Sequence, residues 1–142
     1  MRILIINGPN LNLLGTREPT LYGNQSFEDY LSTLKIQGAQ IDYFQSNIEG
    51  ELITAIQESR LHHDGLVLNA AAYSHTSIGI ADAVSAIDIP VVEVHISNIY
   101  RRENFRHFTY LASRCVGTIA GLGLKGYELA IEFLLSQKEN KE

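Results

Sequence analysis

"ILIIN", residues 3–7, is the first of five short apolar runs of the same kind, which together decide the fold. The other four are "IDYFQ" (41–45), "GLVLN" (65–69), "VVEVH" (91–95) and "CVGTIA" (115–120). The runs are rich in Val and Ile, and most lack the alternation of apolar and polar residues that marks a half-exposed strand. They therefore predict strands that are covered on both faces, as in a parallel sheet.

Amphipathic stretches separate these runs. Residues spaced to share one helix face are Phe27, Tyr30, Leu31 and Leu34 in the first stretch and Leu52, Ile53 and Ile56 in the second. Ser26 followed by Asp29 is typical of a helix start, and a last helix is predicted from about Leu124 to Ser136. Five strands alternating with helices predict an α/β, flavodoxin-like three-layer sandwich formed by one domain, residues 1–142. Its five-stranded parallel sheet is expected to have the order 2-1-3-4-5.

The composition and net charge of the chain argue against several classes of binding partner. The chain of 142 residues has a formal net charge of −5 and no basic stripe, which argues against nucleic acid as a partner. No apolar run reaches the length of a membrane span, so no membrane partner is expected. A lone cysteine, Cys115, fits a reducing cytoplasm, where we expect the protein to act. The metal-binding patterns CxxC and HExxH are absent from the sequence, so no metal site is expected.

Ligands of such sheets bind beyond the carboxyl ends of the strands, near the point where the strand order reverses. The segments that follow strands 1, 3 and 4 are therefore the candidate site. They are residues 8–23, 69–77 and 95–106, and in each of them polar residues interrupt the apolar pattern.

The first segment reads "GPNLNLLGTREPTLYG", residues 8–23, and has the composition of a loop that opens and closes over a site. An Arg17 guanidinium held near Tyr22 would favour the phenolate form of the tyrosine. A phenolate can remove a proton from a carbon that the substrate already makes acidic. The alternative interpretation is a solvated loop in which the arginine stem covers an aromatic ring.

Glu93 and His95 are two residues apart on the fourth predicted strand, so they share a face. A carboxylate beside a histidine favours the imidazolium form and orients the ring, which together make a general acid. The alternative is a buried polar pair with no chemical role. The backbone amides of Ile96 and Ser97 follow at once and could hold an anion.

Four more polar residues are candidates. Asn69 closes the third predicted strand, His75 lies near the start of the next helix, and Arg106 could bind hydroxyl or carboxylate oxygens. Each also has a structural or solvated alternative. Asp82 interrupts the apolar run "SIGIADAVSAI" and would need a partner if it were buried, which a neighbouring subunit could supply.

Taken together, these stretches resemble the type II 3-dehydroquinate dehydratases. The resemblance covers nearly the whole chain and rests on "INGPNLNLLGTREPTLYG", "FQSNIEGELI", "LNAAAYSHTS", "IPVVEVHISNIYRRENFRHF" and "GTIAGLGLKGYELA" in this order. It implies a flavodoxin-like fold, a homododecamer built as a tetramer of trimers, and no metal or organic cofactor. The implied reaction is the reversible trans-elimination of water from 3-dehydroquinate to 3-dehydroshikimate through an enolate, in the shikimate pathway of aromatic amino acid biosynthesis.

The resemblance also implies a role for each candidate residue. Tyr22 matches the catalytic base, Arg17 the lid arginine that keeps the base ionised, and His95 the general acid. Glu93 matches the residue that supports this acid, and Asn10 matches an asparagine that holds a water beside the enolate. The matches to substrate-binding positions are Asn69, His75, Arg106, the amides of Ile96 and Ser97, and Asp82, which would reach into the site of an adjacent subunit.

The sequence departs from the family pattern at four residues. Residues 70–72 read "AAA" where many relatives read "PGA", which would alter the turn beneath the substrate. Ile48 stands where relatives often have His or Phe, and Ala81 stands where many have Arg. The remaining hypotheses are a flavodoxin-like binding module without catalysis and an inactive scaffold. Asn7 and Asn69 end strands where a phosphoacceptor domain would need acidic residues.

Overall fold

The computed structural model describes residues 1–16 and 24–141. In this part of the chain, five parallel strands form one sheet of order β2-β1-β3-β4-β5, which confirms the predicted flavodoxin-like topology. The strands are β1 (Arg2–Asn7), β2 (Gln40–Gln45), β3 (Gly65–Asn69), β4 (Val91–His95) and β5 (Gly117–Ala120).

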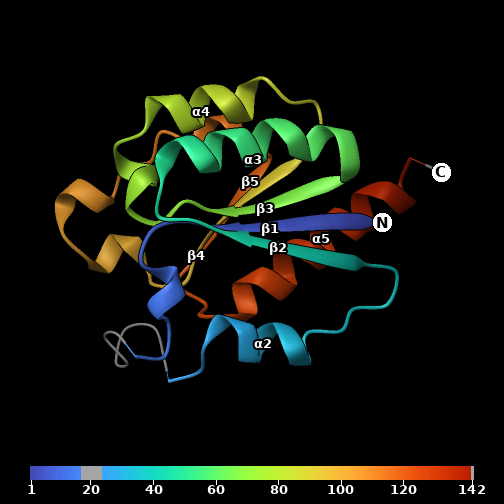
Figure 1. Ribbon diagram of the computed structural model, residues 1–142, viewed down its shortest axis with the longest axis horizontal. Helices are drawn as coiled ribbons and strands as arrows, with labels where there is room; N and C mark the ends of the chain where they lie inside the picture. The colour runs from blue at the N-terminus through green and yellow to red at the C-terminus, as the bar shows by residue number, and fades with distance from the viewer. Residues whose placement is uncertain (17–23, 142) are drawn as a thin grey trace.

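Helices cover both faces of the sheet and complete the three layers. They are α2 (Phe27–Thr33), α3 (Glu49–His62), α4 (Ile78–Ser85) and α5 (Lys125–Glu139). Figure 1 shows α3 and α4 on one side of the sheet and α2 and α5 on the other. Two covered faces explain why the strands lack polar alternation, since both sides of β1, β3 and β4 are buried.

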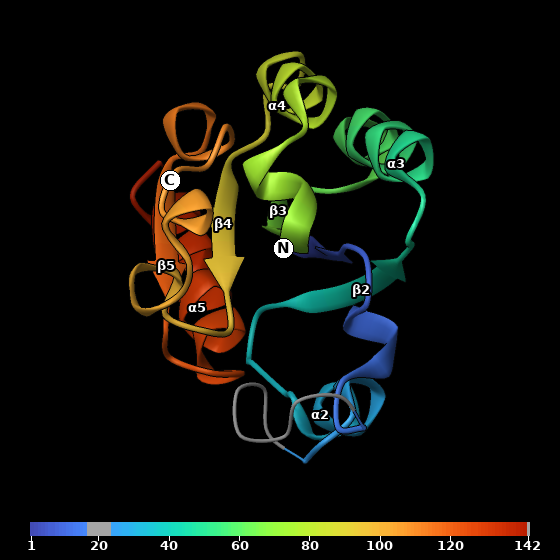
Figure 2. The same ribbon diagram turned by 90° about the vertical axis from the view of Figure 1, so that its left-hand side faces the viewer.

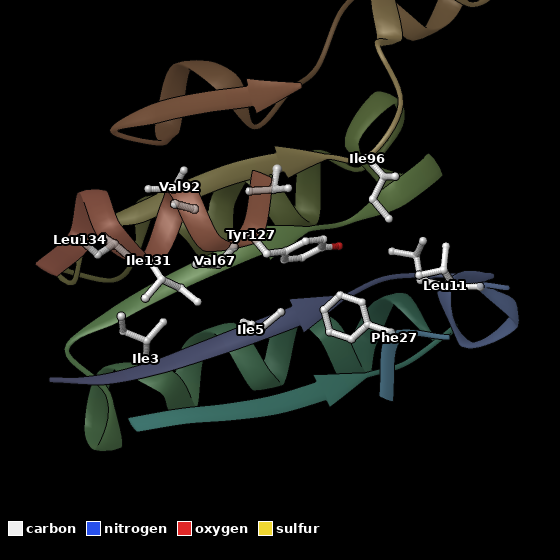
Figure 3. Close-up of a cluster of buried hydrophobic side chains, with 13 residues drawn as sticks. Ile3, Ile5, Leu11, Phe27, Val67, Val92, Ile96, Tyr127, Ile131 and Leu134 are labelled. Carbon is white, nitrogen blue, oxygen red and sulfur yellow. The ribbon is translucent and has the colours of Figure 1, made fainter. Parts of the chain in front are cut away.

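Each face of the sheet carries its own hydrophobic core. Ile3 and Ile5 of β1 pack toward α2 and α5, whereas Leu4 and Ile6 pack toward α3 and α4. In the first core, Tyr127 of α5 is fully buried, and its ring extends along the sheet toward the carboxyl ends of the strands (Figure 3). An apolar core thus reaches the edge where a ligand site is expected.

Side-chain caps set two of the helix starts. The Ser26 hydroxyl accepts a hydrogen bond from the Asp29 backbone N–H at 3.1 Å, as predicted. The cap of α4 is Ser77, whose hydroxyl accepts from the Ile80 N–H at 2.9 Å. Ser74 and Thr76 lie in and just after the short 3₁₀ helix η2 (Ala71–His75), so they are too early in the chain to cap α4.

The last strand is shorter than the apolar run that predicted it. Its pairing with β4 begins at Gly117, because residues 112–114 form a 3₁₀ helix that ends at Cys115. Cys115 therefore lies outside the strand, although it packs against the second core. The last helix also extends to Glu139, one turn farther than predicted.

The carboxyl ends of the strands face the viewer in Figure 2. Short 3₁₀ helices follow β1, β3 and β4 at this edge: η1 (Leu11–Leu13), η2, η3 (Ile99–Arg101) and η4 (Asn104–Arg106). Gly8 brings the first two segments together, since its N–H donates to the Asn69 carbonyl at 2.7 Å. A Cβ at position 8 would lie 2.5 Å from the Ala70 carbonyl oxygen, so only glycine fits.

No helix in residues 1–16 and 24–141 is both long and apolar enough to cross a membrane.

Candidate active site

A cavity of about 110 Å³ lies at the carboxyl edge of the sheet, where the segments after β1, β3 and β4 meet. It combines a histidine pair, amide groups and arginines in one place. The residues predicted from the sequence that line it are Asn10, Asn69, His75, His95, Ile96, Ser97 and Arg106. The segments after strands 1, 3 and 4 therefore meet at one cavity, as expected, and the roles of these residues stay predictions.

Glu93 and His95 form a buried pair at the end of β4. His95 Nε2 lies 2.6 Å from Glu93 Oε2, and the exposed fractions are 5% for His95 and 0% for Glu93. An ionised carboxylate only accepts hydrogen bonds, so Nε2 carries the proton of this contact. The other ring nitrogen, Nδ1, is left to gain or lose a proton, as a general acid requires.

The His75 ring stacks on the His95 ring, with centroids 5.9 Å apart. Its Nδ1 donates to the Phe108 carbonyl at 2.8 Å, because a carbonyl oxygen can only accept. Burial lowers the pKa of His75, an effect that the Phe108 hydrogen bond opposes and the positive charge of Arg106 reinforces. His75 is therefore neutral near pH 7 and offers Nε2 as a hydrogen-bond acceptor.

One backbone N–H determines the orientation of the Asn69 side chain. The Ala71 N–H donates to Asn69 Oδ1 at 3.1 Å, so the amide nitrogen must point the other way, to the Tyr127 hydroxyl at 2.8 Å. That hydroxyl in turn donates to Asn7 Oδ1 at 2.7 Å. The sequence alone left Asn69 free to donate or accept, whereas the structure leaves its second Nδ2 hydrogen for a ligand.

The turn after β3 contains a residue in an unfavourable backbone conformation. Ala71 has a φ of +53°, in the left-handed region where a Cβ meets the following carbonyl. This is the central position of "AAA", where many members of the resembled family have glycine. Asn10, at the cavity wall, also has a positive φ of 70°, which asparagine tolerates better than alanine does.

Two arginines give the cavity a positive lining. Arg102 and Arg106 both line it. Their spacing of four suggests one helix face, but the segment forms no continuous helix. Glu103 is extended between η3 and η4, with φ −60° and ψ 147°. The Arg106 Nε donates to the Glu103 carboxylate at 2.8 Å, which holds the guanidinium at the cavity rim. Arg102 is a polar lining residue that was not among the predicted site residues, although its spacing of four from Arg106 was the available signal.

Two of the predicted residues that the structure describes, Glu93 and Asp82, do not line this cavity. Arg17 and Tyr22 lie outside the described residues. Asp82 is exposed on α4, while its neighbours Ala81 and Ala83 are buried, and it does not line the cavity. Because Asp82 is exposed within the chain, it needs no buried partner there.

Within the described part of the chain, no three His, Cys, Asp or Glu side chains are close enough together to hold a metal ion. A larger groove of about 610 Å³ lies elsewhere, between β2 and α3. Its walls include Leu4, Phe44 and Ile48 and are mainly apolar. The smaller polar cavity lies at the carboxyl ends of the strands, where ligands of such sheets bind, so it is the candidate active site.

The chain matches the family model described as "Dehydroquinase class II" over residues 1–135. It is 53% identical over 135 residues to a 3-dehydroquinate dehydratase of Streptomyces avermitilis, covering 92% of this chain and 85% of that protein. It is 51% identical to a 3-dehydroquinate dehydratase of Prochlorococcus marinus, covering 96% and 97% of the two chains. The crystal structure of a type II dehydroquinase from Propionibacterium acnes is similar, with a TM-score of 0.90 and 43% identity, covering 95% of this chain and 96% of that one.

The family model spans nearly the whole chain, and the cavity lies where the motifs that carry the resemblance converge. The chain belongs to the class II dehydroquinase family.

Proposed function

We propose that the chain catalyses the reversible trans-elimination of water from 3-dehydroquinate to 3-dehydroshikimate, a hydro-lyase reaction of the shikimate pathway. The observation that carries the proposal is the buried Glu93–His95 pair, which opens into a cavity lined by two arginines. An acid held beside positive charge suits a substrate that has a carboxylate and a hydroxyl leaving group. The proposed enzyme is one catalytic domain, residues 1–142, and needs no metal or organic cofactor.

The first step removes a proton. Tyr22, ionised with the help of the Arg17 charge, takes the proton from the carbon next to the substrate ketone. The electron pair of the broken C–H bond forms a C=C bond to the carbonyl carbon, and the carbonyl oxygen takes the negative charge. The product of this step is an enolate. Asn10 holds a water molecule that donates a hydrogen bond to the enolate oxygen. When the loop closes and excludes water, Arg17 acts on Tyr22 at low dielectric, where its effect is larger.

The second step expels water. The enolate re-forms the ketone, the electron pair forms the new C=C bond, and the C–O bond to the hydroxyl breaks. The departing oxygen takes the proton on His95 Nδ1 and leaves as water, while Glu93 stabilises the imidazolium before transfer. Two different groups thus handle the two protons, which suits a trans elimination because base and acid act on opposite faces of the ring.

The remaining site residues orient the substrate. Asn69 donates through its free Nδ2 hydrogen, and His75 accepts a substrate hydroxyl through Nε2. Arg106 binds substrate oxygens at the rim of the cavity. The backbone amides of Ile96 and Ser97 hold the carboxylate, since successive N–H groups form a concave anion site.

The active form is proposed to be a homododecamer, a tetramer of trimers, that acts in the cytoplasm. Asp82 supports the assembly proposal, because it is exposed on α4 and outside the cavity of its own chain. In the assembly it reaches the substrate site of an adjacent subunit. Ala81 lies beside it and is buried in the second core, with 2% of its surface exposed.

The test is an absorbance assay without added metal. Purified protein is mixed with 3-dehydroquinate, and the ultraviolet absorbance of the conjugated enone product is followed. A rise that depends on protein concentration, and that a chelator does not abolish, supports the proposal. Folded protein that gives no rise would contradict it and favour a binding or scaffold role.

A further inference from the structure

The oxygen of Glu93 that does not face His95 is also occupied. Glu93 Oε1 accepts hydrogen bonds from the hydroxyls of Thr109 at 3.1 Å and Thr118 at 3.2 Å. The two threonines come from different segments, since Thr109 precedes the 3₁₀ helix η5 (Ala112–Arg114) and Thr118 pairs with Glu93 across β4 and β5. The carboxylate is thus held at both oxygens, by three side chains in total.

The direction of the Thr109 hydrogen bond follows from the backbone. The Ala112 N–H donates to Thr109 Oγ1 at 3.0 Å, and a backbone N–H can only donate. The single hydroxyl hydrogen of Thr109 is therefore donated to Glu93 Oε1. The contact therefore places a hydrogen-bond donor, and not an acceptor, against Glu93 Oε1.

The same reasoning extends to the histidine. With Oε1 taken by two donors, the ionised carboxylate accepts from His95 Nε2–H through Oε2. The transferable proton is then on Nδ1 and not shared with Glu93. Replacing the hydroxyl of Thr109 or Thr118 by a methyl group would remove one hydrogen-bond donor from Glu93 Oε1. The carboxylate would then be less stabilised, so that the proton could move from His95 to Glu93.

Other charged or titratable groups also surround the pair. On the cavity side are His75, Arg102 and Arg106. On the core side is Cys115, where burial and the negative charge of Glu93 raise the pKa of the thiol to about 12. The thiol is therefore neutral near pH 7, so it places no second negative charge beside Glu93.

We propose that Thr109 and Thr118 are positioning residues for the acid step, which keep Glu93 ionised and the transferable proton on His95. Neither threonine lines the cavity. The inference rests on the proposed dehydration of 3-dehydroquinate, and it concerns only the second of the two steps. It therefore predicts a defect in water expulsion with proton abstraction left intact.

The experiment uses Thr109→Val and Thr118→Val in the full-length protein. Valine has nearly the shape of threonine without the hydroxyl. Turnover is followed by enone absorbance, and exchange of the substrate proton with D₂O by NMR. We expect kcat to fall roughly tenfold in Thr109→Val, while the exchange rate stays near wild type, so that the ratio of exchange to turnover rises. Thr118→Val is expected to raise the same ratio by a smaller factor.

Two further variants separate the effect of losing the hydroxyl from other effects of the substitution. Thr109→Ser keeps both hydrogen bonds and is expected to restore the wild-type ratio. Thr54→Val removes an exposed hydroxyl on α3, far along the chain from β4, and is expected to change neither rate. Thr118 makes no backbone cap in the described residues, and it lies on a strand, where valine is favourable. Thr118→Val therefore tests the positioning role even if Thr109→Val fails to fold.

Equal loss of exchange and turnover in both valine variants, or an unchanged ratio in both, would overturn the inference. Lack of turnover in the wild-type protein would instead contradict the proposed function itself.

Discussion

The Tyr127 hydroxyl lies 2.8 Å from Asn69 Nδ2, although 58 residues separate the two in the sequence. The phenol is fully buried and joins two asparagines that end neighbouring strands, because it also donates to Asn7 Oδ1. Burial raises the pKa of Tyr127 far above its ordinary value, so the hydroxyl keeps its proton and remains a donor. A core residue of α5 thus orients an amide in the wall of the candidate active site.

Tyr127→Phe should therefore damage both stability and substrate binding. It leaves Asn69 Nδ2 and Asn7 Oδ1 buried without this partner, which is expected to lower the free energy of unfolding by about 1–3 kcal/mol. We expect KM for 3-dehydroquinate to rise more than kcat falls, since Asn69 is proposed to bind the substrate and not to react with it. Urea unfolding and steady-state kinetics measure the two effects.

The matched control is Tyr30→Phe. Tyr30 packs in the same aromatic cluster, but its buried hydroxyl makes no well-formed hydrogen bond within the described residues. Its removal is expected to leave stability and KM close to wild type. Equal effects of the two substitutions would show that the Tyr127 hydrogen bonds do not orient Asn69.

Ala71→Gly should stabilise the protein. The left-handed φ of +53° costs alanine about 1–2 kcal/mol, and the larger freedom of glycine in the unfolded chain offsets about 0.4–1 kcal/mol of the gain. A net gain of up to about 1.6 kcal/mol is expected in chemical unfolding. Ala72→Gly, in the same turn but without a positive φ, should not stabilise. A loss of stability in Ala71→Gly would mean that the turn is not strained.

His75 should make stability depend on pH. Its folded-state pKa lies below the ordinary value of 6.5, so below that value the unfolded chain binds more protons than the native one. Stability is then lost as the pH falls from about 6.5 through the lower, folded pKa. His75→Asn should flatten this part of the profile of urea midpoint against pH. An unchanged profile in the variant would assign the pH dependence to other groups.

Asp82 provides a test of assembly by mixing subunits. If it completes the site of an adjacent subunit, Asp82→Ala and Tyr22→Phe should each have low activity alone. Unfolding and refolding them together makes mixed sites, in which one chain supplies Tyr22 and its neighbour supplies Asp82. We expect activity to return to a fraction of wild type set by the mixing ratio. Recovery no greater than the sum of the separate variants would contradict a shared site.

Local patterns in the sequence were sufficient to predict the sheet and the contact between Glu93 and His95. Five apolar runs give the strands, and parallel topology brings their carboxyl ends to one edge, where the structure has its polar cavity. Glu93 and His95 are neighbours on one strand face, so their contact follows from a spacing of two. These predictions depend only on periodicity over a few residues.

Contacts between distant segments could not be predicted in the same way. The hydrogen bonds of Tyr127 to Asn69, and of Thr109 and Thr118 to Glu93, depend on how helices and loops pack against the sheet. The break between Arg102 and Arg106 depends on the backbone of Glu103, which no helical pattern reveals. The roles of Arg17 and Tyr22 stay predictions, since both lie outside the described residues.

The division of labour between base and acid is tested most directly by exchange and turnover in two variants. His95→Ala and Tyr22→Phe are incubated with 3-dehydroquinate in D₂O, with enone absorbance and loss of the substrate proton recorded together. The account predicts that His95→Ala loses turnover but still exchanges the proton, whereas Tyr22→Phe loses both. Absence of exchange in folded His95→Ala, or near-wild-type exchange in Tyr22→Phe, would contradict it.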